Sequence, residues 1–558
     1  MISKYPLFYA FCLNVLFLFI YFVFGEVRYG SLDDYFMSSV LTGAYGSEYD
    51  VHMYFVNSAY GYFLKPFYEL FPKVSWYFIF ELIGTFAAFT TYSYFLIRQQ
   101  GVKWGVALSA VLLASLTPDF YFRLSFTQCA TAYTAAGLLL FFFGVKDQKK
   151  RFLVFGGLFL IFGSIMRYEG FLLGMPYLIL LLFLLWQKRI FFVKRIFIVL
   201  GITVFAICAL QMYDKNLFSD NDYRYYAEYQ PIRAYFGDGA FYDRESSYDE
   251  LEERDKSGPD FKCLKAWMFY DTEVFQIDSL KSIRAIAQNN LYKPNPKRVV
   301  VKYFLSISDA LTRCSGWCWV FFGILLMLSS SKKANIYPWV SFGFIGVCIG
   351  YLLLIDRLVY HVELGIWLYA ITSAIPFMQK DMLTTIDFCS NKKRVVFGGF
   401  VLMIVVFTYI GVSNQEYLKK NISFIETPEM PKDWVEFIDY ASNRPNDVFL
   451  LSYNRYKELA TFKNPAYMAV EPGSWQNIFS WGYWNIHLPG MRAELEKRGV
   501  FNPLRDIVHD NVYVLEDESG PVLNSFYLEH YHDSLFVDSV RIFGKMVLHQ
   551  YRLKKDSL

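Results

Sequence analysis

The chain has 558 residues, of which 55% are hydrophobic, 20% aromatic and only 19% charged, whereas soluble domains usually carry roughly 25% charged residues. This composition excludes an ordinary soluble enzyme and suits a protein that meets hydrocarbon and has aromatic belts at membrane interfaces. The mean hydropathy is only +0.25, so a substantial part of the chain must lie outside the bilayer. The net charge of +3 does not suggest a nucleic-acid partner, and the eight cysteines show neither a disulfide framework nor zinc-type spacing.

Apolar stretches close to the roughly 20 residues that a helix needs to cross hydrocarbon recur along the chain. They lie at about 5–24, 76–97, 104–121, 126–145, 195–212, 314–330, 336–355, 363–379 and 395–413. A further apolar run, 152–186, is too long for one span and is interrupted at 167–170, so we predict a hairpin of two short spans there. The prediction is an all-α polytopic membrane protein with about eleven transmembrane helices. The first span lacks the cleavage site of a signal peptide and is expected to remain as an anchor.

The distribution of Lys and Arg residues between the loops predicts the orientation of these spans. If the amino terminus is cytoplasmic, the inside segments hold seventeen Lys and Arg residues and the short outside loops hold six. This bias fits the positive-inside rule and predicts a multi-pass protein of the plasma (inner) membrane with an extracytoplasmic carboxy-terminal domain.

The predicted domains are a transmembrane domain at 1–414 and an extracytoplasmic domain at 415–558. Within the first, 25–75 forms an outer loop with an interfacial helix, and 213–303 forms a large outer loop with short helices. The carboxy-terminal domain is expected to be small and α/β. Its predicted strands are 447–453 and 511–517, and its predicted helices are 433–441 and 490–499.

Two adjacent carboxylates, Asp33 and Asp34, open a predicted helix directly after the first span. Ser31 and Asp34 have the spacing of a capping box, and acidic residues favour the positive end of a helix, so a structural role is one interpretation. Successive helical residues point about 100° apart, so one Asp can cap while the other faces a cavity. A carboxylate at the outer membrane surface lies where a general base must be if one substrate is held by a lipid tail.

A second cluster lies between two late spans, where Arg357, His361 and Glu363 are packed into a short outside turn. Arg357 and His361 are four residues apart, so a helical turn would place both on one face as an anion clamp. The alternative is an interface Arg and a His bonded to backbone.

Two further places are weaker candidates for substrate binding. Arg167 and Glu169 lie in the hairpin at 167–170, where an ion pair is often a membrane-edge anchor. His52 lies in the outer loop beyond the Asp pair, and it also suits a structural interface role. The tryptophan-rich segment 471–490 suits sugar rings, although packing explains it as well.

These features together resemble the GT-C superfamily of integral-membrane glycosyltransferases. The resemblance rests on one amino-terminal span, a paired-acid motif at Asp33 and Asp34 in the first outer loop, many further spans and an outer carboxy-terminal domain. The hairpin around Arg167 and the turn of Arg357 and His361 are similar to outer loops of such enzymes. The carboxy-terminal domain resembles those of bacterial proteins of surface-polysaccharide synthesis.

The resemblance implies transfer of a sugar from a polyprenyl-phosphate-linked donor to an acceptor glycan or lipid outside the membrane, with inversion. It implies Asp33 or Asp34 as the base. It also implies that Arg357 and His361 hold the leaving phosphate. GT-C members differ in whether the acids hold a divalent cation such as Mg or Mn, and two adjacent acids are few ligands for one.

Other functions remain open at this point. A polysaccharide polymerase or ligase differs from the first hypothesis mainly in the size of its donor. A membrane transporter or lipid flippase predicts ionisable residues near the bilayer midplane and two comparable halves, whereas charged residues here crowd the ends of spans. A membrane acyltransferase would need an intramembrane His, and the histidines lie mostly in outer loops.

Overall fold

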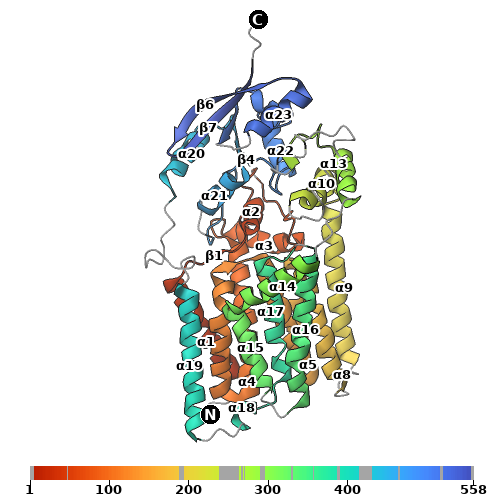
Figure 1. The fold of residues 1–558 in the computed structure, drawn as a ribbon, viewed down its shortest axis with the longest axis vertical. Coiled ribbons are helices and arrows are strands. Elements are labelled where there is room, and N and C mark those ends of the chain that lie inside the picture. The colour runs from red at the N-terminus through yellow and green to blue at the C-terminus, as the bar shows by residue number, and fades with distance from the viewer. Residues whose placement is uncertain are drawn as a thin grey trace.

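The computed structural model describes residues 5–46, 48–187, 194–237, 250, 260, 263–264, 268, 270–289, 296–327, 331–355, 357–385, 390–413, 430–462, 466–515 and 520–554. Most of the described residues are helical, and a five-stranded sheet lies near the carboxy terminus. Figure 1 shows a helical bundle in the lower part and the sheet with its helices above it. The two termini lie at opposite ends of the molecule.

The bundle consists mostly of helices that follow the predicted apolar stretches, together with a helix at 296–311 that begins inside the predicted outer loop. They are α1 (Pro6–Phe24), α4 (Trp76–Tyr121), α5 (Phe126–Lys146), α6 (Lys150–Met166), α8 (Met175–Gln187), α9 (Lys194–Leu217), α14 (Pro296–Leu311), α15 (Cys314–Met327), α16 (Lys332–Leu354), α17 (Tyr360–Thr372) and α19 (Ser390–Ser413). Between α17 and α19 lie the 3-10 turn η2 (Ile375–Phe377) and α18 (Met382–Thr385). The predicted hairpin at 167–170 is present as the short helix α7 (Tyr168–Leu172) between α6 and α8.

The helix α4 is a hairpin of two antiparallel arms. Gly101 breaks it with a φ of 73°, a left-handed conformation that suits glycine. Ser109 Oγ donates to the Ser93 carbonyl oxygen at 3.3 Å, although residues 16 apart in a straight helix lie about 24 Å apart. A Cβ on Gly105 would lie 2.2 Å from the Ile97 Cα, so only glycine lets the arms approach this closely. The arms match the separate spans predicted at 76–97 and 104–121.

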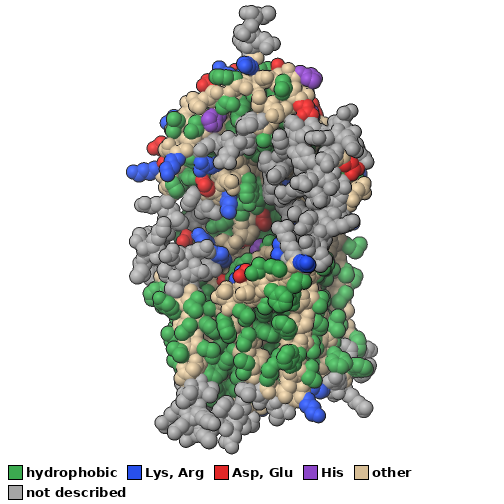
Figure 2. Space-filling view, in the orientation of Figure 1, with side chains coloured by type: hydrophobic (Ala, Val, Ile, Leu, Met, Phe, Trp, Pro, Cys, Tyr) green, Lys and Arg blue, Asp and Glu red, His purple; other side chains and the backbone are tan. Residues whose placement is uncertain are grey.

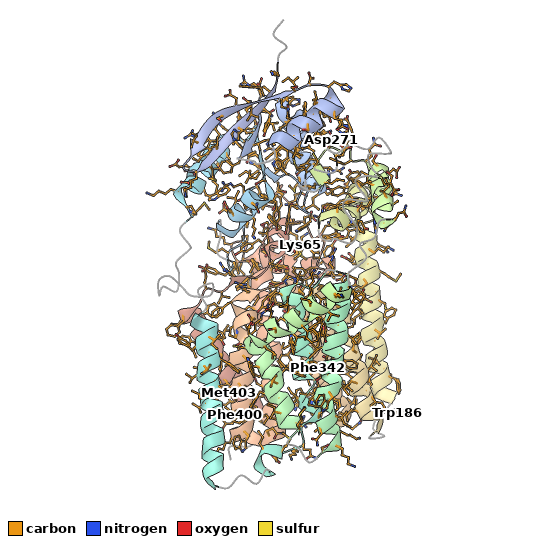
Figure 3. All side chains as sticks on the ribbon, in the orientation of Figure 1. Lys65, Trp186, Asp271, Phe342, Phe400 and Met403 are labelled. Carbon is orange, nitrogen blue, oxygen red and sulfur yellow. The ribbon has the colours of Figure 1, made fainter. Side chains whose placement is uncertain are left out.

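The bundle surface is apolar, as expected of helices that face hydrocarbon. Large apolar side chains point outward, including Phe205 at 74% and Val347 at 72% exposure. Figure 2 shows hydrophobic side chains covering the visible bundle, while charged side chains gather above it. In Figure 3, Phe342, Phe400, Met403 and Trp186 lie on the bundle, whereas Asp271 lies in the upper part. The protein is therefore a multi-pass membrane protein.

The number of spans stays a prediction. Among the described residues, six helices are long and apolar enough to cross a membrane, or seven if the bent pair α14 and α15 is one span. These two helices meet at 83°. The count of six takes the two arms of α4 as one span and omits short helices such as α15 and α17. The prediction of about eleven spans counts the two arms separately and includes these short helices.

A layer of short elements covers the upper end of the bundle. It contains β1 (Arg28–Tyr29), α2 (Leu32–Leu41), α3 (Ser58–Leu70), β2 (Arg123–Leu124), α10 (Asn221–Gly237) and α13 (Ile277–Asn289). The strands β1 and β2 pair in parallel, with Arg28 opposite Arg123. This pairing fixes the start of α2 beside the amino terminus of α5. Much of the predicted loop 213–303 lies outside the described residues.

The carboxy-terminal part is a small α/β domain, as predicted. Its elements are α20 (Lys432–Ser442), β3 (Val448–Leu451), α21 (Tyr453–Phe462), β4 (Ile478–Ser480), α22 (Pro489–Glu496), η3 (Asp506–Val508), β5 (Val512–Leu515), α23 (Gly520–Tyr531), β6 (Leu535–Phe543) and β7 (Met546–Leu553). The strand order is β4-β3-β5-β7-β6, parallel between β4, β3 and β5 and antiparallel at β7 and β6. The fully buried strands β3 and β5 are continuously apolar, as central parallel strands are.

Backbone hydrogen bonds tie this domain to the layer below it. The amide of Trp475 donates to the Ala44 carbonyl at 2.7 Å, and that of Gly473 to the Gly43 carbonyl at 2.9 Å. The amide of Ser75 donates to the Tyr467 carbonyl at 2.9 Å. The domain is thereby held directly over α2.

Candidate functional site

The two adjacent acids at the start of α2 have different surroundings. Ser31 caps the helix, because its Oγ accepts a hydrogen bond from the Asp33 amide at 3.1 Å. The capping hydrogen bond therefore comes from the amide of Asp33, two residues after Ser31. The sequence suggested one from the amide of Asp34, three residues after Ser31. Asp34 points into the protein and is fully buried, whereas Asp33 is half-buried.

Asp34 joins three elements from inside the protein. Its Oδ1 accepts a hydrogen bond from the Tyr77 hydroxyl at 2.9 Å and another from the Phe126 amide at 3.1 Å. It thus links α2 to α4 and caps the amino terminus of α5. Burial raises the pKa of Asp34 well above its ordinary value, although both hydrogen bonds oppose that shift. Asp34 is therefore suited to stabilising the arrangement of α2, α4 and α5 around the site.

Glu81 is a second buried carboxyl near Asp34. Both carboxyl groups are fully buried, and the charge of Asp34 acts on Glu81. Among the described residues, Asp34 Oδ2 and both Glu81 carboxyl oxygens are buried without a hydrogen-bond partner. Two buried like charges near each other are strongly unfavourable, which favours the protonated form of Asp34.

Asp33 is turned toward the α/β domain. Its Oδ1 accepts a hydrogen bond from the Tyr483 hydroxyl, and its Oδ2 accepts one from Ser31 Oγ at 3.3 Å. Burial and the nearby Asp33 charge raise the pKa of Tyr483 well above its ordinary value, so the phenol stays protonated and donates. Tyr483 is itself fixed against Phe36 of α2, with ring centroids 4.7 Å apart.

Arg167 brings a positive charge to the acids. Its Nη1 donates to Thr127 Oγ1 at 2.7 Å, and its guanidinium lies 5.0 Å from the centroid of the Phe126 ring. Burial lowers the pKa of Arg167, whereas the charges of Glu169, Asp33 and Asp34 raise it. These interactions place the α6–α8 hairpin next to the start of α2.

Arg357 and His361 also lie near Arg167. The positive charges of Arg357 and Arg167 act on each other, and the charge of Arg167 also acts on His361. His361 lies in the first turn of α17, and Arg357 lies just before that helix. The predicted acid pair, hairpin Arg and late turn, which are remote in sequence, therefore come together at one end of the bundle beneath the α/β domain. A cluster of cations beside a half-exposed carboxylate can bind a phosphate and accept a proton.

The two glutamates predicted near this cluster differ. Glu169 is largely exposed, and its Oε2 lies 3.8 Å from Arg167 Nε. Glu363 is buried, pairs with Arg313 Nη1 at 3.4 Å and accepts from Trp367 Nε1 at 3.4 Å. Glu363 therefore joins α17 to the bend between α14 and α15.

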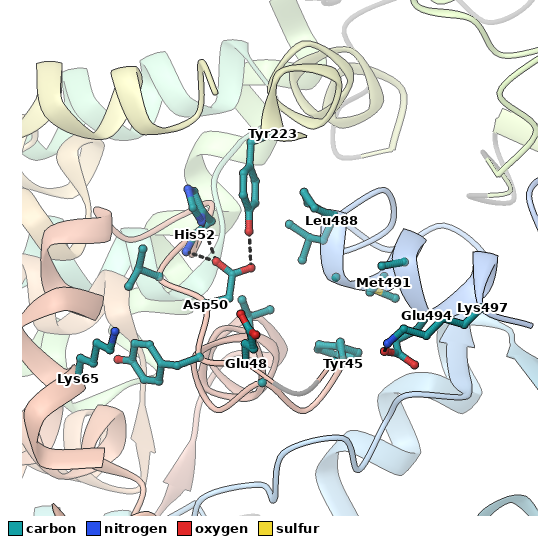
Figure 4. Close-up of a pocket in the computed structure, with 18 of the residues that line it drawn as sticks. Tyr45, Glu48, Asp50, His52, Lys65, Tyr223, Leu488, Met491, Glu494 and Lys497 are labelled. Carbon is teal, nitrogen blue, oxygen red and sulfur yellow. Dashed lines mark hydrogen bonds and ion pairs between the residues drawn. The ribbon is translucent and has the colours of Figure 1, made fainter. Parts of the chain in front are cut away.

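His52 lies at a separate cavity of about 530 Å³ between the loop that follows α2 and α22. Its Nδ1 lies 2.7 Å from Asp50 Oδ1, and its ring stacks on Tyr223 at 3.6 Å. The Tyr223 hydroxyl donates to Asp50 Oδ2 at 2.7 Å. Figure 4 shows this trio on one side and Glu494 and Lys497 on the facing side. The volume falls within the roughly 300–1,000 Å³ of small-molecule sites.

Sequence reasoning missed two residues of these sites. Tyr483 was treated only as part of an aromatic segment, and no local pattern indicates that it reaches Asp33 across 450 positions. Asp50 has a local signal, because it lies two residues before His52, a spacing that lets a carboxylate accept a hydrogen bond from a nearby backbone amide.

The acid pair does not supply the ligands of a metal ion. Among the residues that the structure describes, no three His, Cys, Asp or Glu side chains are grouped as a metal site. Among the described residues, hydrogen bonds engage three of the four carboxyl oxygens of Asp33 and Asp34. A divalent cation here does not fit the described residues.

The fold and site define a multi-pass membrane protein with an α/β domain over one end of its helical bundle and an acid and cation cluster between the two. No family model matches the sequence. Among solved structures, the chain is similar to the crystal structure of ArnT from Cupriavidus metallidurans in the apo state, with 11% identity and a TM-score of 0.38 over 97% of this chain and 96% of that chain. It is also similar to the same protein bound to undecaprenyl phosphate, with 10% identity and a TM-score of 0.35 over 98% of each chain. Similarity at this level of identity and TM-score does not indicate function, so function is inferred from the residues of the site.

Proposed function

We propose that the protein is a membrane glycosyltransferase that moves a sugar from a polyprenyl-phosphate-linked donor to an acceptor glycan or lipid outside the membrane. One observation carries the proposal: Asp33, Arg167, Arg357 and His361 gather at one end of an apolar bundle, beneath the α/β domain. A lipid phosphate has its charge at such an interface and its tail in hydrocarbon.

In this proposal Asp33 is the general base. The acceptor hydroxyl loses its proton to Asp33 as its oxygen forms a bond to the anomeric carbon. The bond from that carbon to the phosphate oxygen breaks with its electron pair, and attack from the opposite face inverts the centre. Tyr483 holds the carboxylate in position through its hydrogen bond.

The leaving group is polyprenyl phosphate, which needs positive charge more than a proton. Arg167 and Arg357 supply that charge, and His361 adds a hydrogen-bonding group beside them. The repulsion between the two arginines is relieved when an anion binds between them. The mechanism requires no metal ion.

We assign the cavity at His52 to a distal part of the acceptor. Carboxylates such as Asp50 accept hydrogen bonds from sugar hydroxyls, and rings such as Tyr45 and Tyr62 offer faces to sugar rings. The ten-residue helix α2 separates this cavity from Asp33, a length of about 15 Å, so the acceptor would be longer than one sugar.

We place the site on the outer side of the plasma membrane and the amino terminus in the cytoplasm. The excess of Lys and Arg in the predicted inside segments supports this orientation. The opposite positions of the two termini agree with it.

The test uses the purified full-length protein in lipid nanodiscs, a set of polyprenyl-phosphate-linked sugars and an acceptor extract from the native envelope. Mass spectrometry follows free polyprenyl phosphate and the sugar added to acceptor. We expect both products to form together with wild type and with the surface variant Asp439→Asn, and neither with Asp33→Asn. Movement of intact donor across the bilayer of sealed proteoliposomes, without cleavage, would instead identify a flippase. Transfer of a whole glycan chain would identify a polymerase or ligase.

A further inference from the structure

A second site lies at the opposite end of the bundle from Asp33. A groove of about 920 Å³ runs between α1, α4 and α6. Its walls are largely apolar, with Phe8 and Phe11 of α1 facing Phe152, Phe155 and Phe159 of α6.

The mouth of the groove is cationic. Arg98, Lys149 and Arg151 surround the Phe152 ring, with their charged groups 5.7, 5.4 and 5.4 Å from its centroid. Arg98 is paired with Asp147 at 2.6 Å. Among the described residues, Lys149 and Arg151 make no ion pair with a carboxylate.

These cations lie where a helix least favours them. Lys149, Lys150 and Arg151 stand at the amino terminus of α6, the positive end of the helix dipole. Within the described structure this terminus has no side-chain cap and no acidic residue in its first turn. Free amides, the dipole and the side-chain charges therefore all favour an anion at this point.

Apolar side chains extend along α6 beyond this charged mouth. A further hollow of about 260 Å³ is lined by aromatic and aliphatic side chains and shares Phe155 and Phe159 with the groove. An anion that binds at the mouth therefore has an apolar surface beside it, which a free phosphate would leave uncovered and an acyl chain would cover.

We propose that this groove binds an anionic phospholipid. Its phosphate lies at the amino terminus of α6 between Lys149 and Arg151, and an acyl chain extends past Phe155 and Phe159. The site lies at the end of the bundle away from the α/β domain, so it is separate from the donor site proposed above and does not depend on it. Charge complementarity selects an anionic headgroup over a zwitterionic one.

Native mass spectrometry of the full-length protein in detergent tests this site. Phosphatidylglycerol and phosphatidylcholine with identical acyl chains are titrated separately, and glycerol phosphate serves as a competitor. We expect phosphatidylglycerol to bind wild type at least tenfold more tightly, with no competition from glycerol phosphate. Equal affinity for both lipids, or displacement by glycerol phosphate, would overturn the proposal.

Two sets of variants locate the lipid. Lys149→Gln with Arg151→Gln should lose the tenfold preference, whereas Lys332→Gln with Lys333→Gln, which removes two cations from the start of α16, should keep it. Ala87→Leu narrows the groove on the α4 side without changing its charge, so it should weaken the binding of both lipids. Unchanged phosphatidylglycerol binding in the first double variant would overturn the proposal. If that variant fails to fold, the wild-type titrations still decide.

Discussion

The Tyr483 hydroxyl in the α/β domain donates a hydrogen bond to Asp33 at the start of α2, across 450 positions of the chain. The domain is thus part of the site, since it orients the carboxylate that we propose as the base. Backbone hydrogen bonds from Gly473 and Trp475 to the first outer loop hold it there.

Tyr483→Phe tests this positioning role. Loss of a hydrogen bond to a charged group is worth about 1.5–3 kcal/mol, so we expect kcat to fall at least about tenfold. The KM for the lipid donor should change little, because the substitution leaves every cation of the proposed phosphate site in place. Steady-state kinetics measure both, and Tyr440→Phe, in α20, is the control. An unchanged kcat would show that Asp33 does not need this partner.

Asp34→Asn tests the structural role of the buried acid. Burial raises the pKa of Asp34, so the folded state retains a proton that the unfolded state has lost above its ordinary pKa of about 3.9. The contribution of Asp34 to stability therefore falls as pH rises from about 4 toward its raised pKa. Thermal unfolding at several pH values should show the wild type losing stability relative to Asp34→Asn as pH rises. Parallel curves would mean that Asp34 is ionised in the folded protein.

Arg357→Gln tests the phosphate site. Removal of a cation that donates to a phosphate should weaken polyprenyl phosphate binding by about tenfold or more. Binding of polyprenol, which lacks the phosphate, should not change. Native mass spectrometry gives both affinities, with Arg444→Gln in the α/β domain as the control. Equal loss for phosphate and alcohol would point to general disruption of the bundle.

His52→Ala tests the cavity beside α22. The ring stacks on Tyr223 and contacts Asp50, so its loss should raise the KM for the acceptor severalfold with little change in kcat. His549→Ala, in β7, is the control. A fall in kcat without a change in acceptor KM would place His52 in the chemical step instead.

Chelation tests the absence of a metal from the mechanism. We expect transfer to continue after treatment with EDTA and after extensive dialysis, since the described residues around the acid pair do not fit a divalent cation. Loss of activity that Mg²⁺ or Mn²⁺ restores would contradict this expectation.

Much of the fold could be predicted because hydropathy and charge act locally. The arms of α4 were separated correctly, since Arg98 and Lys103 interrupt the apolar pattern at the Gly101 turn. The strands β3 and β5 were recognised from short apolar runs. The pairing of β1 with β2 could not be predicted, because two-residue strands carry no periodicity.

The site was predictable only in part. Residue types and their places between spans indicated Asp33, Asp34, Arg167, Arg357 and His361. Helical geometry indicated that the two acids point apart, but not which one is buried. That depends on Tyr77 and the Phe126 amide, which reach Asp34 through tertiary packing.

The rates of sugar transfer by Asp33→Asn and Asp34→Asn, measured side by side in nanodiscs, test the central claim most directly. Loss of a general base costs roughly 10²–10⁴-fold, so Asp33→Asn should lose that much while Asp34→Asn stays within about tenfold of wild type. Full activity in Asp33→Asn, with the protein folded, would contradict the account.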